Sequence, residues 1–207
     1  MHHLKDDKKE AVEKGIFRTI LQKGLLGILI PERIMLLNFN YTTVADRYLP
    51  NNEKFAINHI HGSINDIEGM IFGYGDELDN DYRRIQEIND NEYLKNIKSV
   101  RYLESSNYRN MLSFTEAGPF QIYIMGHSCG NSDRTLLNTL FEHKNCVSIK
   151  PFYYKKRDGQ GKKVSDNYME IVQNISRNFT DMKLFRDRVV NKEYCEPLYQ
   201  VKKPTVD

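Results

Sequence analysis

Apolar residues along this chain fall into short continuous runs, which alternate with longer segments whose apolar positions recur at helical spacing. Continuous runs of this length are typical of strands buried on both faces of a sheet. The runs that predict strands are residues 33–39 (RIMLLNF), 55–60 (FAINHI), 69–73 (GMIFG), 120–125 (FQIYIM) and 146–152 (CVSIKPF). Helical spacing predicts helices over residues 12–21, over 133–143 and from about 168 onwards.

Two segments interrupt this alternation. Residues 77–118 are long, polar and charged, and they predict a helical insertion of two or three helices outside the sheet. Residues 153–166 (YYKKRDGQGKKVSD) are basic and contain glycine, which predicts a loop. Ser165 or Asp166 at its end is expected to cap the following helix.

Buried strands that alternate with helices predict a Rossmann-like α/β fold. It would have three layers, with a mostly parallel sheet of about five strands between two layers of helices. The last twenty residues hold two prolines and show little periodicity. We therefore expect one domain over residues 1–187 and an extended tail over residues 188–207.

Three polar clusters follow predicted strands, at the carboxyl ends where open α/β sheets bind ligands. The clusters are NFNYTT (38–43), HIHGS (59–63) and GHSCGNSD (126–133). Because parallel strands end at the same edge of a sheet, we expect Asn40, His61 and Ser128 to converge on one cleft.

Composition narrows the class of protein. The 207 residues suffice for a full core, and 30 basic against 28 acidic side chains leave a net charge of only +2, which argues against a dedicated nucleic-acid surface. The three cysteines are odd in number and form no CxxC pair, so we expect a reducing, cytoplasmic compartment. The longest apolar run, Leu25 to Ile30, is too short to span a bilayer, and no membrane association is expected.

The letters GHSCG, residues 126–130, match the GxSxG nucleophile elbow of α/β-hydrolases. In that fold the histidine follows the serine in the chain, and His143 is the histidine after Ser128. At about 1.5 Å per helical residue it would lie roughly 22 Å away, too far for a general base. The serine hydrolase is therefore the weaker alternative. The simpler interpretation is a tight turn followed by a helix that Ser132 or Asp133 caps.

A zinc site is a second alternative. His59 and His61 alternate along a predicted strand, and His127 with Cys129 would complete four ligands. The spacing matches no common zinc pattern, and a buried histidine more often serves as a hydrogen-bonded core residue. We therefore expect no metal.

Taken together, the three clusters resemble the AbiH family, which is associated with bacterial abortive infection against phage. The resemblance runs from about residue 34 to 143 and rests on the order of the three clusters. The family is distantly similar to sirtuin-like NAD-consuming domains, which carry a strand-end Asn, a His-Gly and a Gly-x-Ser in the same order. The resemblance implies an antiviral defence protein with NAD or a related nucleotide as its substrate and a NAD(P) glycohydrolase-like activity.

The resemblance also implies roles for individual residues. Asn40 matches the asparagine beside the nicotinamide ribose, and His61 matches the general base, so these two are the expected catalytic residues. An amide can donate to and accept from a hydroxyl or a water, and a histidine titrates near neutral pH. The expected cofactor-binding residues are Thr42, Gly62, Ser63, Gly126, His127, Ser128 and Asp133.

Two features depart from the resemblance. Thr42 stands where sirtuin-like domains usually carry an acid, and no Gly-rich strand and turn precede residue 34. A fragment, a truncated gene product and a divergent member are therefore all open. The alternative function is a catalytically inactive binding, sensor or scaffold module, which would form a homo-oligomer or recognise a phage component.

Overall fold

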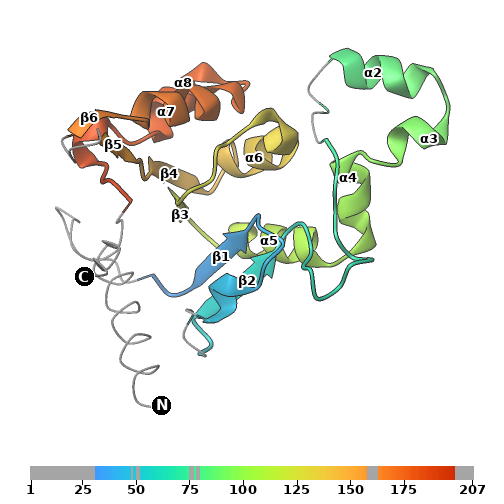
Figure 1. Ribbon diagram of the computed structural model, residues 1–207, viewed down its shortest axis with the longest axis horizontal. Coiled ribbons are helices and arrows are strands. Elements are labelled where there is room, and N and C mark those ends of the chain that lie inside the picture. Colours follow the sequence, from blue (N-terminus) through green and yellow to red (C-terminus); the bar gives the residue numbers. More distant parts are fainter. Residues whose placement is uncertain are drawn as a thin grey trace, which may run out of the picture. The chain divides into compact units, whose positions relative to one another are not determined.

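The computed structural model describes residues 31–47, 49, 52–74, 77, 80–157 and 163–198 (Figure 1). The helix predicted over residues 12–21 lies outside these ranges. Within them the chain divides into two compact units, which are described separately below. The first holds the described residues up to Ile71 together with Ser105–Met111, and the second holds Phe72–Glu104 together with the described residues from Leu112.

The first unit is built on two neighbouring parallel strands, β1 (Ile34–Asn38) and β2 (Phe55–His59). Both predicted strands are confirmed, and their register pairs Ile34 with Phe55 and Asn38 with His59. The short 3-10 helix η1 (Val44–Arg47) lies in the connection between them. Both strands therefore end at the same edge, one beside the other (Figure 1).

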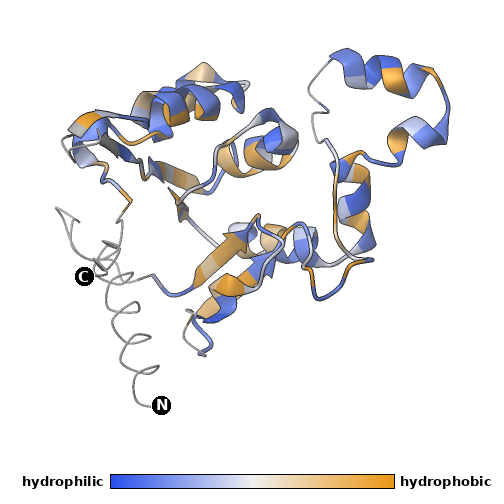
Figure 2. Cartoon of the chain, in the orientation of Figure 1, coloured by the Kyte–Doolittle hydropathy of each residue, from blue (hydrophilic) through white to orange (hydrophobic). Residues whose placement is uncertain are grey.

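The core of the first unit is apolar around a few polar side chains. Ile60, Ile71 and Met111 are almost fully buried, and Figure 2 shows both strands largely in the hydrophobic colour. Asn58 is buried on β2 and donates to the carbonyl of Asn107 at the start of helix α5 (Asn107–Glu116). The start of α5 therefore completes this unit, although it is far away in the sequence.

The second unit contains a βαβ element made of β3 (Phe120–Ile124), α6 (Arg134–Phe141) and β4 (Cys146–Pro151). The strands pair in parallel, as predicted, with a register shift between Phe120 and Gln121. A helix between two parallel strands is the usual crossover connection. The predicted helix over residues 133–143 is therefore confirmed in α6, which is shorter at both ends.

Helices α6, α7 (Tyr168–Arg177) and α8 (Met182–Arg188) pack against β4. The buried side chains between them include Leu136, Leu137, Leu140, Phe141, Ile149, Ile171 and Ile175. Helical spacing predicted α7. Its N-cap residue is Asn167 and not the expected Ser165 or Asp166, although Asp166 accepts a hydrogen bond from the Tyr168 amide. The pattern did not predict α8.

The described residues of the segment 77–118 are mainly helical, as predicted, but they form more helices than the two or three expected. These helices are α2 (Asn80–Glu87), α3 (Asn91–Leu94), α4 (Lys98–Arg101), the 3-10 helix η2 (Tyr102–Glu104) and α5. No residue of α2 is buried, and Figure 2 shows this helix as mostly hydrophilic. The segment nevertheless contributes to both units, because residues from Ser105 to Met111 belong to the first.

Two local predictions are wrong. The basic segment predicted as a loop contains an antiparallel pair, β5 (Lys155–Arg157) with β6 (Lys163–Asp166). The run GMIFG at 69–73 is not a strand. The Ile71 amide donates to the His61 carbonyl, and the Ile71 carbonyl accepts from the Tyr41 hydroxyl. The hydroxyl of a side chain therefore binds the carbonyl that a neighbouring strand would bind in a sheet.

The strands described here pair as β1–β2, β3–β4 and β5–β6, in three two-stranded sheets. The mixed α/β class and the parallel pairing are therefore confirmed, whereas the five-stranded sheet and the three-layer Rossmann-like arrangement stay predictions. Parts of the predicted tail run beside β4, since Val190 donates to Ile149 and Leu198 donates to Tyr153. A 3-10 helix, η4 (Lys192–Tyr194), interrupts that extended course.

Candidate functional site

The two strand ends of the first unit bring the predicted catalytic residues to one edge. Asn38 and His59 face each other in register, and each strand is followed within two residues by a predicted catalytic side chain. Asn40 is exposed in the turn after β1, and His61 is buried in the turn after β2. This half of the predicted convergence is therefore present within one unit.

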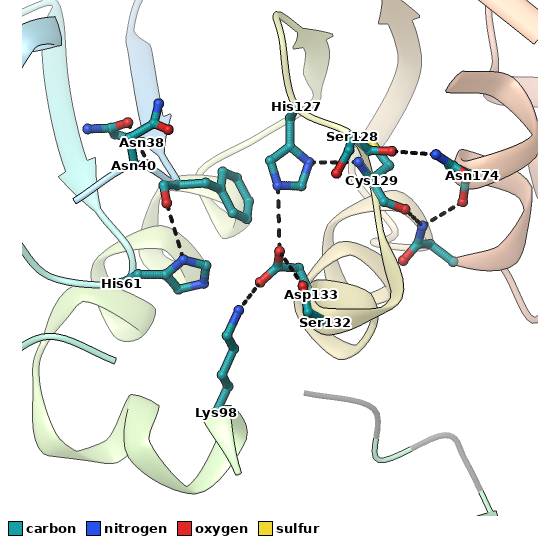
Figure 3. Close-up of polar contacts among 12 residues, drawn as sticks. Asn38, Asn40, His61, Lys98, His127, Ser128, Cys129, Ser132, Asp133 and Asn174 are labelled. Carbon is teal, nitrogen blue, oxygen red and sulfur yellow. Dashed lines mark hydrogen bonds and ion pairs between the residues drawn. The ribbon is translucent and has the colours of Figure 1, made fainter. Parts of the chain in front are cut away.

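Asn38 holds the turn that carries Asn40 and Thr42 (Figure 3). Its Oδ1 accepts the Asn40 amide at 3.1 Å, and its Nδ2 donates to the Thr42 carbonyl at 3.0 Å. The same Nδ2 lies 3.0 Å from Nδ1 of His59 on the neighbouring strand. The amide is 7% exposed, so one buried side chain closes the turn at both ends.

His59 is fixed from two sides. Because the Asn38 Nδ2 only donates, the His59 Nδ1 must accept, and the ring proton therefore sits on Nε2. That nitrogen lies 3.0 Å from the Asp46 carboxylate on η1, so it donates there. His59 is consequently a structural residue of the strand end, which agrees with its interpretation as a satisfied core histidine.

His61 lies against the turn of the neighbouring strand. Its Nδ1 is 3.4 Å from the carbonyl of Phe39, the residue before Asn40, in a long hydrogen bond. The carbonyl can only accept, so Nδ1 carries the proton and Nε2 is the basic nitrogen. The ring packs edge-on against Phe39, with 5.4 Å between centroids, and is 3% exposed.

Gly62 and Ser63 shape the turn after His61. Gly62 has φ +78°, and a Cβ there would come within 2.4 Å of the Gly69 carbonyl oxygen. The close approach that this glycine permits is thus to the chain's own backbone. Ser63 accepts the Asn65 amide at 3.2 Å and stabilises the following turn. Ligand binding by both residues stays a prediction.

The third cluster forms a strained loop in the second unit, between β3 and the 3-10 helix η3 (Asn131–Asp133). Gly126 and Cys129 have φ +76° and +54°. Ser128 is exposed. His127 Nδ1 accepts the Cys129 amide at 3.1 Å, which closes the loop on itself.

Helix α7 holds the same loop from the outside (Figure 3). Asn174 donates to the Ser128 carbonyl at 2.9 Å. Asn178, fully buried, donates to the Cys129 carbonyl at 2.9 Å. The backbone of the loop is therefore held by two hydrogen bonds, while Ser128 itself stays exposed.

Asp133 forms a buried ion pair instead of capping α6, so the predicted capping role is wrong. Its Oδ1 is 2.7 Å from Lys98 Nζ on α4. Its Oδ2 is 3.3 Å from the Ser132 hydroxyl and 3.6 Å from His127 Nε2. No side-chain capping bond is made from Asp133 to α6. Contact of this carboxylate with a ribose stays a prediction, but both of its oxygens are already engaged.

Cys129 is inert in this environment. It is 1% exposed, and burial, with a smaller contribution from the negative charge of Asp133, raises the pKa of its thiol to about 12. A metal ligand must lose its proton, which this environment opposes. Among the residues that the structure describes, no group of three or more His, Cys, Asp and Glu side chains is arranged to hold a metal ion.

The contacts of the histidines argue against a serine hydrolase. His143 Nε2 is 3.3 Å from Glu116, and its Nδ1 accepts the Asn145 amide. Helix α6 lies in the chain between this histidine and Ser128. The adjacent His127 uses its Nδ1 lone pair for the Cys129 amide. Neither ring is therefore oriented as a base toward Ser128.

Sequence reasoning missed the residues that hold the candidate site in place, which are Asn38, Asp46, Lys98, Asn174 and Asn178. The role of Asn38 could have been predicted, because a polar residue at the end of a buried apolar run needs a hydrogen-bond partner. Asp46, Lys98 and Asn174 lie on helices, and Asn178 directly follows α7. Their partners lie 13 to 49 residues away in the chain, and no local pattern marks such a pair.

Comparisons with known proteins agree with the resemblance seen in the motifs. The family model described as bacteriophage abortive infection AbiH matches residues 3–155, which is most of the chain and includes all three polar clusters. No curated protein and no solved structure gives a significant match. Within the described ranges, none of the helices has the length and apolar character needed to cross a membrane. The chain belongs to the AbiH family of bacteriophage abortive infection proteins.

Proposed function

We propose that this AbiH protein cleaves the glycosidic bond between nicotinamide and ribose in NAD or a related nucleotide, with Asn40 and His61 as its catalytic residues. In this reaction the bond between C1′ and the nicotinamide nitrogen breaks, and its electron pair leaves with nicotinamide. The water oxygen bonds to C1′, and a water proton passes to a base. The products are nicotinamide and ADP-ribose.

The two residues have complementary parts in this reaction. Positive charge builds on the ribose as nicotinamide leaves, so an amide oxygen beside the sugar stabilises it and orients the water. The basic Nε2 of His61 takes the water proton. The predicted binding residues of the same unit, Thr42, Gly62 and Ser63, would contact the ribose and phosphates.

One observation carries the proposal: the parallel pairing of β1 with β2 brings the turns of Asn40 and His61 together. His61 Nδ1 lies 3.4 Å from the carbonyl of the residue before Asn40. Asn40 and His61, which are 21 residues apart in sequence, thus follow neighbouring strands at one edge. The family match is consistent with a defence protein, and it leaves the chemistry to experiment.

The test is release of nicotinamide from NAD by the purified protein. We expect His61→Gln to lower the rate about 10²–10⁴-fold, the usual contribution of a general base, and Asn40→Ala with His61→Ala to abolish it. His143→Gln is the matched control, because that histidine contacts Glu116 on α5 and is not a predicted site residue. Activity that survives the double substitution would exclude these roles.

A second candidate function is a binding or scaffold module that has lost catalysis. The burial of His61 favours it, since a ring that is 3% exposed and packed on Phe39 is also what a purely structural histidine shows. Calorimetry separates the two functions. A protein that binds neither NAD nor ADP-ribose, and releases no nicotinamide, would be such a module.

A further inference from the structure

We propose that Asn38 is the positioning residue of this site. It sets the conformation of the turn that presents Asn40 and Thr42, and His59 with Asp46 fixes Asn38 in turn. The inference rests on the proposed function for its catalytic meaning. Its structural content concerns the three contacts of the Asn38 amide and the contact of His59 with Asp46.

The orientation of the Asn38 amide is determined by its neighbours. Its Oδ1 faces the Asn40 N–H, which only donates, and its Nδ2 faces the Thr42 carbonyl, which only accepts. Exchanging the two atoms would place donor against donor and acceptor against acceptor. A buried amide with unmatched partners loses on the order of 1–3 kcal/mol for each group left unsatisfied, so a single orientation is populated.

The histidine and the carboxylate behind it complete the arrangement. Nδ1 of His59 accepts the second Nδ2 proton of Asn38, which requires the Nε2–H tautomer. Asp46 stabilises that tautomer by accepting from Nε2 at 3.0 Å. The exposed Asp46 carboxylate thus holds the His59 ring in one tautomer, and the ring holds the buried Asn38 amide. The Asn38 amide in turn holds the turn of Asn40.

Only an amide satisfies this environment, which needs one acceptor and two donors at the end of a short side chain. Asn38→Asp keeps an acceptor for the Asn40 amide but cannot donate to Thr42 or to His59. Asn38→Leu keeps a similar volume and loses all three contacts. The two variants therefore separate the anchoring of Asn40 from the rest of the network.

The first measurement is amide hydrogen exchange together with the ring nitrogen signals of His59 by NMR. We expect the wild type to show the Nε2–H tautomer. In Asn38→Leu the Asn40 amide should exchange at least tenfold faster, while Asn38→Asp keeps most of the protection and shifts the His59 proton toward Nδ1. Asp46→Ala, at an exposed position, removes the acceptor of His59 Nε2 and should also populate the Nδ1–H tautomer.

Asn58→Asp is the matched control, because Asn58 is a buried amide on β2 that contacts Asn107 and none of the three residues of the turn. It should destabilise the protein without selectively exposing the Asn40 amide. Equal exchange at Asn40 in the wild type and Asn38→Leu would overturn the proposal. So would the same acceleration in Asn58→Asp.

The second measurement is nicotinamide release. A positioning residue should affect kcat more than KM, so we expect kcat to fall at least tenfold in Asn38→Leu, to recover partly in Asn38→Asp and to change little in Asn58→Asp. A loss confined to KM would contradict positioning. If the wild type releases no nicotinamide, the proposed function fails, whereas the exchange data still decide whether Asn38 sets the turn.

Discussion

Asp133 and Lys98 show how burial redirects a residue at the start of a helix. The carboxylate follows a Gly-containing loop and precedes α6, where a short acidic side chain usually accepts backbone amides. Lys98 instead lies 2.7 Å away, and both side chains are about nine-tenths buried. A buried charge needs a charged partner more than a helix end needs this particular cap.

We expect Lys98→Met to destabilise the protein by about 3 kcal/mol, because it leaves the Asp133 carboxylate buried without its counter-charge. Lys98→Met with Asp133→Asn should recover part of the loss. Urea unfolding measures both. Lys144→Met is the control, since it breaks an exposed ion pair with Glu116 and should leave stability nearly unchanged. A double variant less stable than Lys98→Met would contradict this interpretation.

We expect the buried Cys129 thiol to lower the free energy of unfolding at alkaline pH. The thiol ionises near its ordinary pKa of 9.0 in the unfolded chain, but burial and then Asp133 raise its pKa to about 12 in the fold. Between these values the unfolded state binds fewer protons, so the free energy of unfolding falls as pH rises. The slope approaches about 1 kcal/mol per pH unit for this thiol.

Urea unfolding at pH 8 and pH 10.5 tests this, with Cys129→Ala compared with the wild type. The wild type should lose more stability across the interval than the variant does. Cys146 and Tyr168, whose pKa values burial also raises, add the same slope to both proteins and cancel in the comparison. Parallel losses in the two proteins would show that Cys129 is not the source.

At the scale of elements, the N-terminus of α8 depends on a residue after another helix. Glu142 accepts the amides of Thr180 and Asp181 at 2.6 and 2.7 Å and the Thr180 hydroxyl at 2.7 Å. Asp181 itself caps α8 by accepting from Lys183 and Leu184. The end of α6 is thereby joined to the start of α8.

Glu142→Gln should lower the melting temperature at pH 7 by about 2–4 °C, because a neutral amide accepts these hydrogen bonds less strongly. Burial raises the pKa of Glu142, but the hydrogen bonds from Asp181 and Thr180 outweigh it and the net pKa is lowered. Its stabilising contribution is therefore present at neutral pH and disappears as pH falls below the ordinary value of 4.5.

The difference in melting temperature between Glu142→Gln and the wild type should consequently become smaller as the pH is lowered to 3. Glu170→Gln, an exposed position on α7, is the control and should melt with the wild type at both pH values. A difference that persists unchanged at pH 3 would mean that packing of the side chain, and not its charge, stabilises α8.

Apolar runs predicted the four parallel strands because each strand is short and largely apolar, and the pattern holds within five or six residues. The same criterion failed at 69–73, where Gly73 has φ +131°, a backbone conformation outside the strand region. The β5–β6 pair was not predicted because it lacks an apolar run. Its residues are mostly charged, and backbone pairing alone carries no apolar signature.

For the whole molecule, the sequence predicted the class of fold and the residues that end its strands, but not the contacts that hold them. Alternating elements imply parallel pairing wherever a helix or long connection intervenes, which β3, α6 and β4 confirm. The pairing of Lys98 with Asp133 and of Asn58 with Asn107 joins segments 35 and 49 residues apart. Such pairs form only when the chain is packed in three dimensions, so the periodicity of a local segment does not predict them.

Membership of the AbiH family assigns the chain to abortive infection, and the proposed cleavage of NAD predicts separate effects of substitutions on binding and on rate. We expect His61→Gln to bind NAD within about twofold of the wild type while releasing nicotinamide far more slowly, because a general base acts on the bound water and not on affinity. Ser63→Ala, at a predicted binding residue in the same unit as His61, should do the reverse. Loss of one ribose hydrogen bond would weaken binding roughly 2–10-fold and leave the rate at saturating NAD unchanged.

Calorimetry and nicotinamide release on the same protein samples distinguish these effects. Ser113→Ala, an exposed serine on α5, is the control and should match the wild type in both. If His61→Gln and Ser63→Ala change neither binding nor release, the strand ends of the first unit do not form a nucleotide site. The burial of His61 and the fixed loop around Cys129 would then serve stability alone, as expected of a module that acts in defence by binding another molecule.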